Sequence, residues 1–354
     1  GQVWVYPGTC RTLIEKEADA NRTNGVPYVI RIKVPSEKLS FTDMLRKEIT
    51  FDTALIGDIV VAKNLREPLY NFAVVVDDFE MKISHVIRGE DHIANTPKQM
   101  VIARSLGFPF PEFGHMPLIL NPNKSKMSKR DGGAALADYR NDGYLPEALI
   151  NFLALLGWHP EGDQEVISMA ELIKKFDMSR VQKAGAVFNI EKLDWFNAHY
   201  IKQKTDSELL DLLSPDYIDS KWASDSWKLL KVIALTKERL KKLSDFKNLA
   251  GLFFELPDYP KELLVWKKSD AAKAQENVLE TKKILENLPE TEFQKSRLEA
   301  ALMSFVEKQG RGDVLWPLRG AVSGSQNSPG PFEIIDALGK TETLRRLEIA
   351  IKKL

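Results

Sequence analysis

The spacing of hydrophobic residues changes character along this chain of 354 residues. Residues 28–34 alternate apolar and basic side chains, which predicts a half-buried strand, and further strands are predicted over residues 56–63 and 70–76. From Pro146 onward almost every segment has helical spacing. The chain is too long for one compact core. We therefore expect an α/β part followed by an all-helical part, with the division near Lys204.

The second part carries clear helix signals. Residues 205–208, Thr-Asp-Ser-Glu, form a capping box ahead of a run of leucines. Apolar residues recur at helical spacing, with few breakers, over residues 227–243, 271–288 and 297–307. The last helix is predicted over residues 341–354, with one face made of Leu344, Leu347, Ile351 and Leu354.

Composition places the chain among ordinary water-soluble proteins. Apolar residues make up 44% and charged residues 28%, and no apolar run approaches the roughly 20 residues that span a membrane. Basic and acidic residues balance at 50 each, so the net charge does not point to a nucleic-acid partner. The single cysteine, Cys10, excludes an intramolecular disulfide. We expect a cytoplasmic protein without a membrane segment.

A strand, a loop and a helix follow one another in the first part. Residues 82–87 are predicted to be a strand, residues 88–92 (Arg-Gly-Glu-Asp-His) a loop, and Thr96 the N-cap of a helix that ends at Gly107. Open α/β sheets bind their ligands at the carboxyl ends of strands. On the pattern alone, an ordinary connection between strand and helix is favoured over a ligand site.

The most specific local motif is a basic pentapeptide, made of Lys126, Met127, Ser128, Lys129 and Arg130 and followed by two glycines. Lysine brings a mobile positive charge to phosphate oxygens, and glycine lets the backbone approach a ligand closely. Such cations stabilise the charge that develops on a leaving pyrophosphate. The alternative is a solvated basic loop, but a chance match in a chain of this length is about one in five thousand. We therefore predict a triphosphate-binding loop.

This pentapeptide resembles the KMSKS motif of class I aminoacyl-tRNA synthetases, and the ending in arginine is common in the glutamyl branch. Other segments resemble the same branch in the same order, namely residues 28–35, 69–78, 86–92, 115–122, 143–149, 155–158, 188–193 and 329–335. The resemblance therefore covers essentially the whole chain and is to the bacterial-type glutamyl-tRNA synthetase family.

The resemblance implies a fold of four parts. Residues 1–74 would be the remainder of an acceptor-stem-binding insertion, and residues 75–110 the second half of a Rossmann-type catalytic domain. Residues 111–204 would form a stem-contact region that carries the basic loop. Residues 205–354 would form a helical anticodon-binding domain.

The resemblance also implies roles for single residues. Arg88 would hold the carboxylate of the substrate glutamate, and Tyr70 would hydrogen-bond the same substrate. ATP would be bound by Asp91, His92, Ile119, Lys126, Met127, Ser128, Lys129 and Arg130. Lys129 would be the main catalytic cation, supported by Lys126 and Arg130, whereas we expect a structural role for His115.

One motif of the family has no match in this sequence. Class I synthetases carry a His-Ile-Gly-His tetrapeptide whose imidazoles contact the ATP phosphates, but the five histidines here, at positions 85, 92, 115, 159 and 199, are all isolated. The residues that grip the amino group of the substrate are also missing. We therefore expect an incomplete, poorly active fragment or truncated gene product.

The metal expectations follow from the same comparison. Cys10 lies in a segment like the end of one that binds zinc in some relatives, but one cysteine cannot build a tetrahedral site. Zinc is therefore not expected, and no residue is predicted to bind a resident metal. Magnesium is expected to arrive with ATP.

In the helical part, the resemblance implies contacts with the anticodon. Five cations cluster there and could meet phosphates, namely Lys237, Arg239, Lys241, Lys242 and Lys247. Three tryptophans, Trp222, Trp227 and Trp266, could stack on anticodon bases. Core packing is the commoner role of such tryptophans.

The resemblance thus implies ATP-dependent activation of L-glutamate and its transfer to the 3′ end of tRNA-Glu by a monomer. A non-catalytic tRNA-binding paralogue and a non-discriminating enzyme that also charges tRNA-Gln remain alternatives. The relative that glutamylates queuosine lacks a helical second half, and a glutaminyl enzyme is expected to end in β-barrels. A generic helical interaction protein would not explain the first part.

Overall fold

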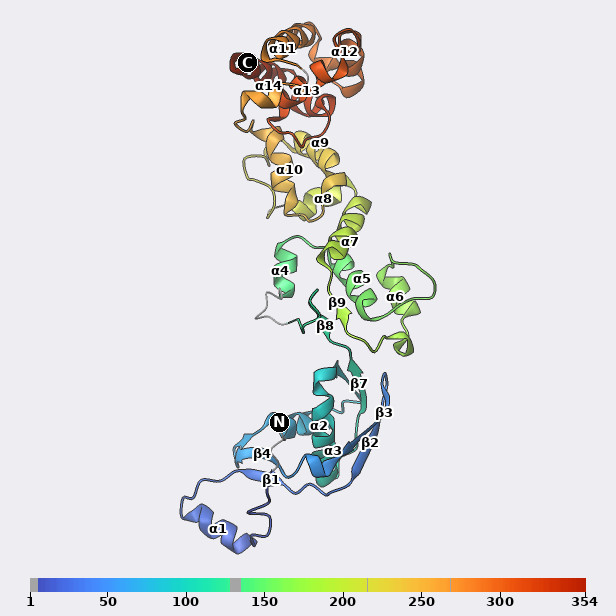
Figure 1. The fold of residues 1–354 in the computed structure, drawn as a ribbon, viewed down its shortest axis with the longest axis vertical. Coiled ribbons are helices and arrows are strands. Elements are labelled where there is room, and N and C mark those ends of the chain that lie inside the picture. The colour runs from blue at the N-terminus through green and yellow to red at the C-terminus, as the bar shows by residue number, and fades with distance from the viewer. Residues whose placement is uncertain (1–5, 128–134, 215, 268) are drawn as a thin grey trace. The chain divides into compact units, whose positions relative to one another are not determined.

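The computed structural model describes residues 6–127, 135–214, 216–267 and 269–354, and the chain divides into two compact units (Figure 1). The first, which we call the α/β unit, consists of Gly1–Gly133 and Leu153–Asn189. The second, which we call the helical unit, consists of Ala134–Phe152 and Ile190–Leu354. Helix α5 (Pro146–Gly157) begins in the helical unit and ends in the α/β unit.

The α/β unit contains a four-stranded sheet in the order β3-β2-β7-β6. Strands β2 (Lys38–Asp43) and β3 (Lys47–Asp52) form an antiparallel hairpin. Strand β7 (Glu112–Met116) pairs in parallel with β2 on one side and with β6 (His85–Gly89) on the other. Every second side chain of β2 is buried, and the last of these is Asp43. The alternation of the strand thus delivers a carboxylate to the interior.

A second sheet and two helices complete the core of this unit. The sheet runs β1-β4-β5, with β1 (Ile30–Ile32), β4 (Ile59–Asn64) and β5 (Glu67–Pro68) all antiparallel. Helices α2 (Tyr70–Glu80) and α3 (Thr96–Leu106) pack through Val75, Ile102 and Ala103 against Val61 of β4. Met100 and Val101 of α3 pack against Phe41 and Phe113 of the first sheet.

The remaining elements of the α/β unit are short. They are α1 (Glu15–Thr23), α6 (Met169–Lys175), and the parallel pair β8 (Ile119–Leu120) and β9 (Ala186–Val187). The 3-10 helices are η1 (Thr53–Leu55), η2 (Glu90–Asn95) and η4 (Met178–Arg180).

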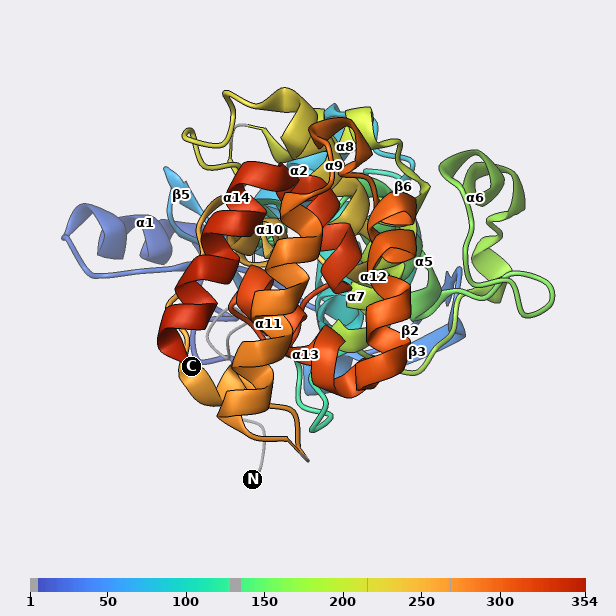
Figure 2. The same ribbon diagram turned by 90° about the horizontal axis from the view of Figure 1, so that it is seen from above.

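The described part of the helical unit is built from helices. They are α4 (Leu136–Asn141), α7 (Ile190–Gln203), α8 (Asp206–Leu213), α9 (Ser226–Thr236), α10 (Asp245–Phe254), α11 (Ala271–Glu286), α12 (Lys295–Gln309), α13 (Arg311–Ser323) and α14 (Pro331–Lys353). Shorter 3-10 helices are η5 (Lys237–Arg239), η6 (Lys261–Leu264) and η7 (Glu290–Glu292). Helices α11, α12, α13 and α14 pack against one another (Figure 2).

A buried arginine holds part of this bundle together. Arg346 of α14 is fully buried; its Nε donates to Glu342 at 2.7 Å, and its Nη1 donates to the carbonyls of Leu252 at 2.7 Å and Val322 at 2.6 Å. A hydrogen bond from Arg345, burial and then a hydrogen bond from Arg346 act on the carboxyl of Glu342, and the net effect lowers its pKa to about 2. The paired guanidinium therefore links α14 to α10 and α13.

One predicted strand is wrong. Residues 70–76 belong to helix α2, although their apolar run Phe72–Val76 favours a strand by composition. Val75 is buried, and Phe72 and Val74 are partly buried against the same core cluster. A short apolar run cannot distinguish a buried strand from a buried helix, and packing against α3 and β4 decides for the helix here.

Other boundaries also differ from the sequence-based expectations. Arg88 is not in a loop, because β6 extends to Gly89 and is followed by the 3-10 helix η2. The N-cap of α3 is Asn95 rather than Thr96, whose buried hydroxyl instead bonds other side chains. The helix predicted over residues 227–243 ends at Thr236.

Several local predictions are confirmed. The helix α3 ends at Gly107, whose φ of 73° is left-handed, and Thr205 and Glu208 form the capping box of α8. The strand of residues 28–34 is present but shorter, and the strand of residues 56–63 is β4. The predicted last helix is the part of α14 beyond the kink at Gly339. None of the described helices is both long enough and apolar enough to cross a membrane.

We predict that Gly143→Ala destabilises the helical unit by about 2–4 kcal/mol. Gly143 has a φ of 85°, and an added Cβ would lie 2.6 Å from the Cβ and 2.7 Å from the backbone nitrogen of Leu243. Urea unfolding followed by circular dichroism measures the effect. Gly251→Ala in α10 is the control, because no atom lies within 4 Å of its added Cβ. It should be neutral or stabilising by about 0.5–1 kcal/mol, and equal stabilities of the two variants would contradict the prediction.

Candidate functional site

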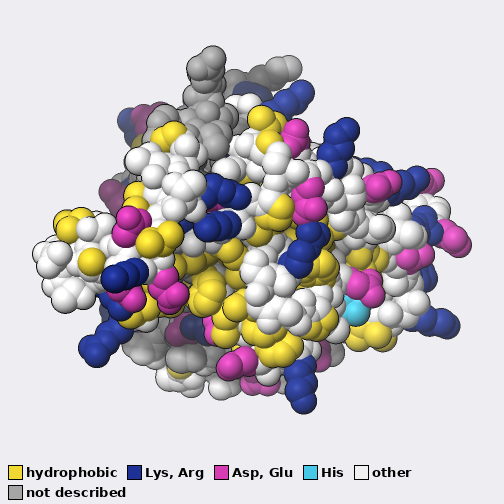
Figure 3. Space-filling model, turned by 90° about the horizontal axis from the view of Figure 1, so that it is seen from below, with side chains coloured by type: hydrophobic (Ala, Val, Ile, Leu, Met, Phe, Trp, Pro, Cys, Tyr) yellow, Lys and Arg dark blue, Asp and Glu magenta, His cyan; other side chains and the backbone are white. Residues whose placement is uncertain are grey.

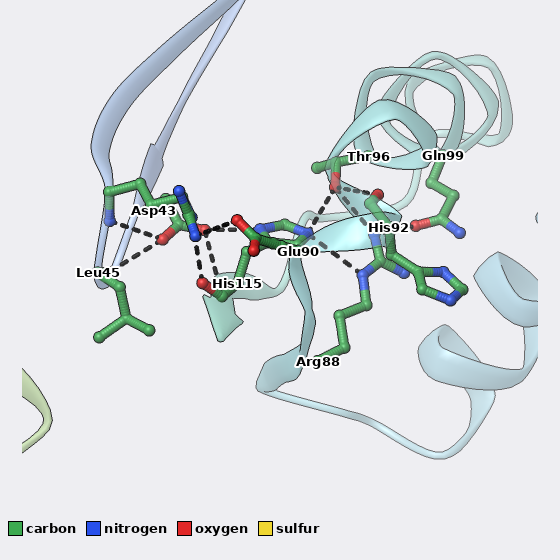
Figure 4. Close-up of polar contacts among 9 residues, drawn as sticks. Asp43, Leu45, Arg88, Glu90, His92, Thr96, Gln99 and His115 are labelled. Atoms are coloured by element: carbon green, nitrogen blue, oxygen red, sulfur yellow. Dashed lines mark hydrogen bonds and ion pairs between the residues drawn. The ribbon is translucent and has the colours of Figure 1, made fainter. Parts of the chain in front are cut away.

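Arg88 lies at the carboxyl end of β6, which pairs in parallel with β7. Its half-buried guanidinium contacts three neutral groups (Figure 4). The Nη2 atom donates to the Thr96 hydroxyl at 2.9 Å and to Gln99 Oε1 at 2.8 Å. The Nε atom donates to His115 Nε2 at 3.3 Å. The side chain is thus oriented by polar groups that do not neutralise it.

The charge of Arg88 has no direct carboxylate partner among the described residues. Across the described ranges of the chain, no carboxylate oxygen lies within 4.0 Å of its guanidinium. Burial lowers the pKa of Arg88 from its ordinary value, and the nearby Tyr70 and Asp78 offset only part of that effect. A half-buried guanidinium without a counter-ion favours an anionic ligand, and its planar fork matches a carboxylate.

Behind Arg88, the Asp43 carboxylate and the His115 ring form a fully buried pair. His115 Nδ1 lies 2.7 Å from Asp43 Oδ2, which also accepts the His115 backbone N–H at 3.1 Å. Asp43 Oδ1 accepts the backbone N–H groups of Leu45 and Arg46, both at 2.9 Å. Burial alone would raise the pKa of Asp43, but the hydrogen bonds from His115, Arg46 and Leu45 outweigh burial and lower it. The expected structural role of His115 therefore agrees with its position.

An ion pair between Arg46 and Glu90 lies next to the Asp43–His115 pair. Arg46 is paired with Glu90, and its Nε donates to the His115 carbonyl at 3.3 Å. Glu90 Oε1 accepts the backbone N–H of Leu118 at 3.2 Å. The contacts of Arg46 and Glu90 hold the segment just after β6 against the end of β7.

Tyr70 and His92 lie near Arg88. Tyr70 is the first residue of α2 and is 54% exposed, so its ring is available to a ligand. The rings of Tyr70 and His92 meet edge to face with centroids 6.0 Å apart. Asn95 Nδ2 lies 3.4 Å from His92 Nδ1. The two predicted ligand-binding rings are thus neighbours.

The beginning of the basic pentapeptide lies beside the segment that follows β6. Residues 119–127 form a tight turn in which Met127 N donates to the Ile119 carbonyl at 3.0 Å. Lys126 Nζ lies 2.6 Å from Asp91 Oδ2, and this hydrogen bond is the main cause of a lowered pKa at Asp91. Both side chains are exposed, so the pair contributes little stability. Ser128, Lys129 and Arg130 lie outside the described residues, and their roles stay predictions.

A separate cavity of about 450 Å³ lies between α2, α3 and the start of β7. Its lining includes the aromatic residues Phe79, Phe110 and Phe113 and the polar residues Asp78 and Gln99. Burial raises the pKa of Asp78. Figure 3 shows hydrophobic side chains gathered in the middle of one face, with lysine and arginine side chains around them. Because none of the sequence-predicted site residues lines this cavity, the candidate site is the one around Arg88.

Several residues of the site were not predicted. Asp43, Arg46, Glu90, Thr96 and Gln99 support Arg88 and its neighbours. One signal was available, because Asp43 occupies an inward position at the end of an alternating strand. Thr96 and Gln99 are three residues apart and therefore share a helix face. Their common target, Arg88, lies on another element.

In the helical unit, most of the predicted phosphate contacts already have protein partners. Lys237 pairs with Asp206 at 3.3 Å, Lys242 with Asp142 at 3.4 Å and Lys247 with Asp219 at 3.8 Å. Arg239 donates to the Asn327 carbonyl at 3.3 Å. This cluster is therefore weaker as a phosphate site than its sequence indicates.

The three tryptophans differ in exposure. Trp222 is buried and stacks on Phe254, with ring centroids 4.5 Å apart, so it is a core residue. Trp266 is partly buried, and its ring centroid lies 5.0 Å from that of Trp316. Trp227 is 66% exposed, and Lys231 Nζ lies 3.8 Å from its ring centroid. Of these three, Trp227 best offers a ring to a nucleic-acid base.

The described residues contain no group of three or more His, Cys, Asp or Glu side chains that could hold a metal ion. Cys10 is exposed and free. The structure therefore provides no support for a resident metal in the described ranges.

Comparison with known proteins adds two domain matches. The model of the catalytic domain of class I tRNA synthetases (E and Q) matches residues 4–195, and an anticodon-binding-domain model matches residues 208–351. The glutamate–tRNA ligase of Carboxydothermus hydrogenoformans is 37% identical over an alignment of 360 residues. The match covers 98% of this chain and 74% of that protein. Glutamate–tRNA ligase 1 of Thermoanaerobacter pseudethanolicus is 40% identical over 366 residues, with 99% and 74% coverage.

A solved structure is similar throughout this chain. The glutamate tRNA ligase from Elizabethkingia meningosepticum, crystallised with its amino acid, superposes with a TM-score of 0.84 at 32% identity. The match covers 99% of this chain and 75% of that one.

The buried His115 predicts a loss of stability in mild acid. Burial lowers its pKa below the ordinary 6.5, and the positive charges of Arg88 and Arg46 add to this effect, while the bond to Asp43 offsets part of it. Below 6.5 the unfolded chain therefore binds a proton that the folded chain does not. The free energy of unfolding should fall as the pH is lowered from about 7.5 to about 5, by on the order of 1 kcal/mol per unit of pKa difference.

Denaturant titrations at several pH values test this dependence. His115→Gln should lower the overall stability and flatten the slope, because the titrating group is gone. His159→Gln, at an exposed histidine of the same unit, should keep the wild-type slope. An unchanged slope in His115→Gln would contradict the prediction.

Proposed function

The chain belongs to the family of class I tRNA synthetases for glutamate and glutamine, and we propose that it acts as a glutamate–tRNA ligase. Its α/β catalytic part is followed by a helical anticodon-binding domain, as the two domain matches indicate. The observation that carries the substrate proposal is the half-buried guanidinium of Arg88, which has no carboxylate partner among the residues that the structure describes. A carboxylate of glutamate would complete this site.

The proposed reaction has two steps. A carboxylate oxygen of glutamate attacks the α-phosphorus of ATP, the bond to the bridging oxygen breaks, and pyrophosphate leaves with its electron pair. A hydroxyl of the terminal adenosine of tRNA then attacks the carbonyl of the adenylate, and AMP leaves. No protein nucleophile is needed, so the protein acts through positioning and charge stabilisation.

Arg88 and Tyr70 are proposed to hold glutamate. Tyr70 lies near Arg88 and its ring contacts that of His92, which supports a common pocket. The ATP site is proposed to comprise Asp91, His92, Ile119, Lys126, Met127, Ser128, Lys129 and Arg130. The ion pair between Asp91 and Lys126 supports this grouping, because it joins the segment after β6 to the basic pentapeptide. Magnesium would enter as part of the substrate, the magnesium–ATP complex.

Several finer proposals go beyond the family assignment. The 354 residues contain no His-Ile-Gly-His tetrapeptide, so we propose that they bind substrates but activate glutamate poorly. The monomer that the family resemblance implies is retained as a proposal. The division at residues 1–74, 75–110, 111–204 and 205–354 is retained as a proposal about domain roles. A non-catalytic tRNA-binding paralogue remains the second candidate.

We predict that Arg88→Lys weakens glutamate binding by about 30-fold or more. Lysine keeps the charge but loses the planar fork and the bonds that orient it. Isothermal titration of the chain with glutamate and with glutamine measures the effect without requiring turnover. The matched control is Arg104→Lys, at an arginine of α3 that pairs with Glu37 on the surface. Wild-type affinity in Arg88→Lys would contradict the assignment of Arg88.

We predict that the immobilised chain retains tRNA-Glu from total bacterial tRNA at modest salt. Retention of tRNA-Gln as well would indicate a non-discriminating enzyme, and retained tRNA that mirrors the input would contradict selective binding. Trp227→Ala should weaken retention by about 1–3 kcal/mol if its exposed ring stacks on a base. Trp227→Phe keeps a ring and serves as the control.

A further inference from the structure

We propose that Asp43 and His115 form a positioning pair that keeps the unprotonated nitrogen of the His115 ring toward Arg88 and thereby leaves the charge of Arg88 free for the substrate carboxylate. The proposal rests on the proposed role of Arg88 in binding glutamate. The three residues come from adjacent strands, since Asp43 is paired with Phe113 across β2 and β7, and Arg88 with His115 across β6 and β7.

The first step concerns the proton on the ring. Both oxygens of Asp43 accept hydrogen bonds from backbone N–H groups: Oδ1 from Leu45 and Arg46, and Oδ2 from His115. An ionised carboxylate can only accept. His115 Nδ1, which lies 2.7 Å from Oδ2, must therefore carry a proton and donate it to Asp43.

The second step concerns the opposite nitrogen. His115 is 0% exposed, and burial lowers the pKa of its ring, which favours the neutral form. A neutral ring protonated at Nδ1 has a lone pair at Nε2. Arg88 Nε, which can only donate, lies 3.3 Å from this lone pair. A proton on Nε2 would instead point one N–H group at another.

Thr96 does not determine the choice of tautomer. Its hydroxyl lies 3.1 Å from His115 Nε2 and 3.4 Å from the His92 carbonyl. It can donate to the ring or accept from it, so it tolerates either tautomer. Only Asp43 and Arg88 are restricted to one hydrogen-bonding role, and both require the proton on Nδ1.

The consequence concerns the charge of Arg88. A carboxylate in direct contact would orient the guanidinium but also neutralise it. Here the imidazole ring stands between Asp43 and Arg88, and the contacts of Arg88 are neutral acceptors. Arg46, the other cation that faces the ring, already has Glu90 as its partner. The pair thus orients Arg88 without consuming the charge that a ligand needs.

Asp43→Asn tests the proposal with almost no change in shape. Oδ1 accepts two backbone N–H groups and Oδ2 accepts one, so the new amide nitrogen is expected to take the place of Oδ2. There it faces His115 Nδ1 and loses the bond from the His115 backbone N–H. A donor at this point favours the tautomer with the proton on Nε2. We expect glutamate affinity to fall about 10- to 100-fold, because the Nε2 proton displaces Arg88.

Nitrogen NMR of chains with ¹⁵N-labelled histidine provides a readout that a general loss of stability would not change. Wild type should show a protonated Nδ1 at His115, and Asp43→Asn should show a protonated Nε2. Leu39→Ala is the control for stability, because Leu39 is buried on the same strand and bonds none of these groups. It should keep the wild-type tautomer and glutamate affinity within about 2-fold.

Three results would overturn the proposal. They are a proton on Nε2 in wild type, wild-type affinity in a folded Asp43→Asn chain, and equal losses of affinity in Asp43→Asn and Leu39→Ala. The wild-type spectrum shows which ring nitrogen of His115 carries the proton, so it tests the proposal even if Asp43→Asn does not fold. Unchanged glutamate binding in Arg88→Lys would instead refute the proposed function, whereas the tautomer at His115 would still report on the pair.

Discussion

The α/β unit depends on the hydrogen bond between Asp43 and His115. A fully buried carboxylate is costly unless its oxygens are satisfied, and Asp43 meets this requirement with three backbone N–H groups and one ring N–H. These bonds join the end of β2, the turn into β3 and the end of β7. Because β6 lies in parallel register with β7, the same bonds determine what faces Arg88.

Arg346 is fully buried and Arg88 is half-buried, and a comparison of the two shows how a structural arginine differs from a ligand-binding one. Arg346 is fully buried, but Glu342 accepts from its Nε and two carbonyls accept from its Nη1, so the ion pair neutralises its charge within the bundle. Arg88 is held by a hydroxyl, an amide and an imidazole, all neutral. These contacts therefore orient the guanidinium of Arg88 but do not neutralise its positive charge. An anionic ligand can supply the negative charge that neutralises it.

That Arg88 lies near the carboxyl end of a strand was predictable, because a strand followed by a helix is visible in the local pattern, although the pattern placed Arg88 in the loop rather than in β6. The nature of the segment around Tyr70 was not. Its run of valines favours a strand by composition, yet it forms α2, since one face packs on α3 and β4. The alternation along its strand could show that the side chain of Asp43 points inward, but its partner His115 lies 72 residues away in the sequence. Nothing in the spacing of the sequence connects them.

The sequence by itself determined the local features of this protein. The capping box at Thr205, the helix end at Gly107 and the helical second half depend on interactions within a few residues. The basic pentapeptide and the family resemblance are likewise properties of the sequence. Only the tertiary structure decided which charges remain unpaired, because burial and partners are set by strand register and helix packing. For that reason, only the three-dimensional fold separates Arg88, which has no carboxylate partner in the described ranges, from the paired cations around it.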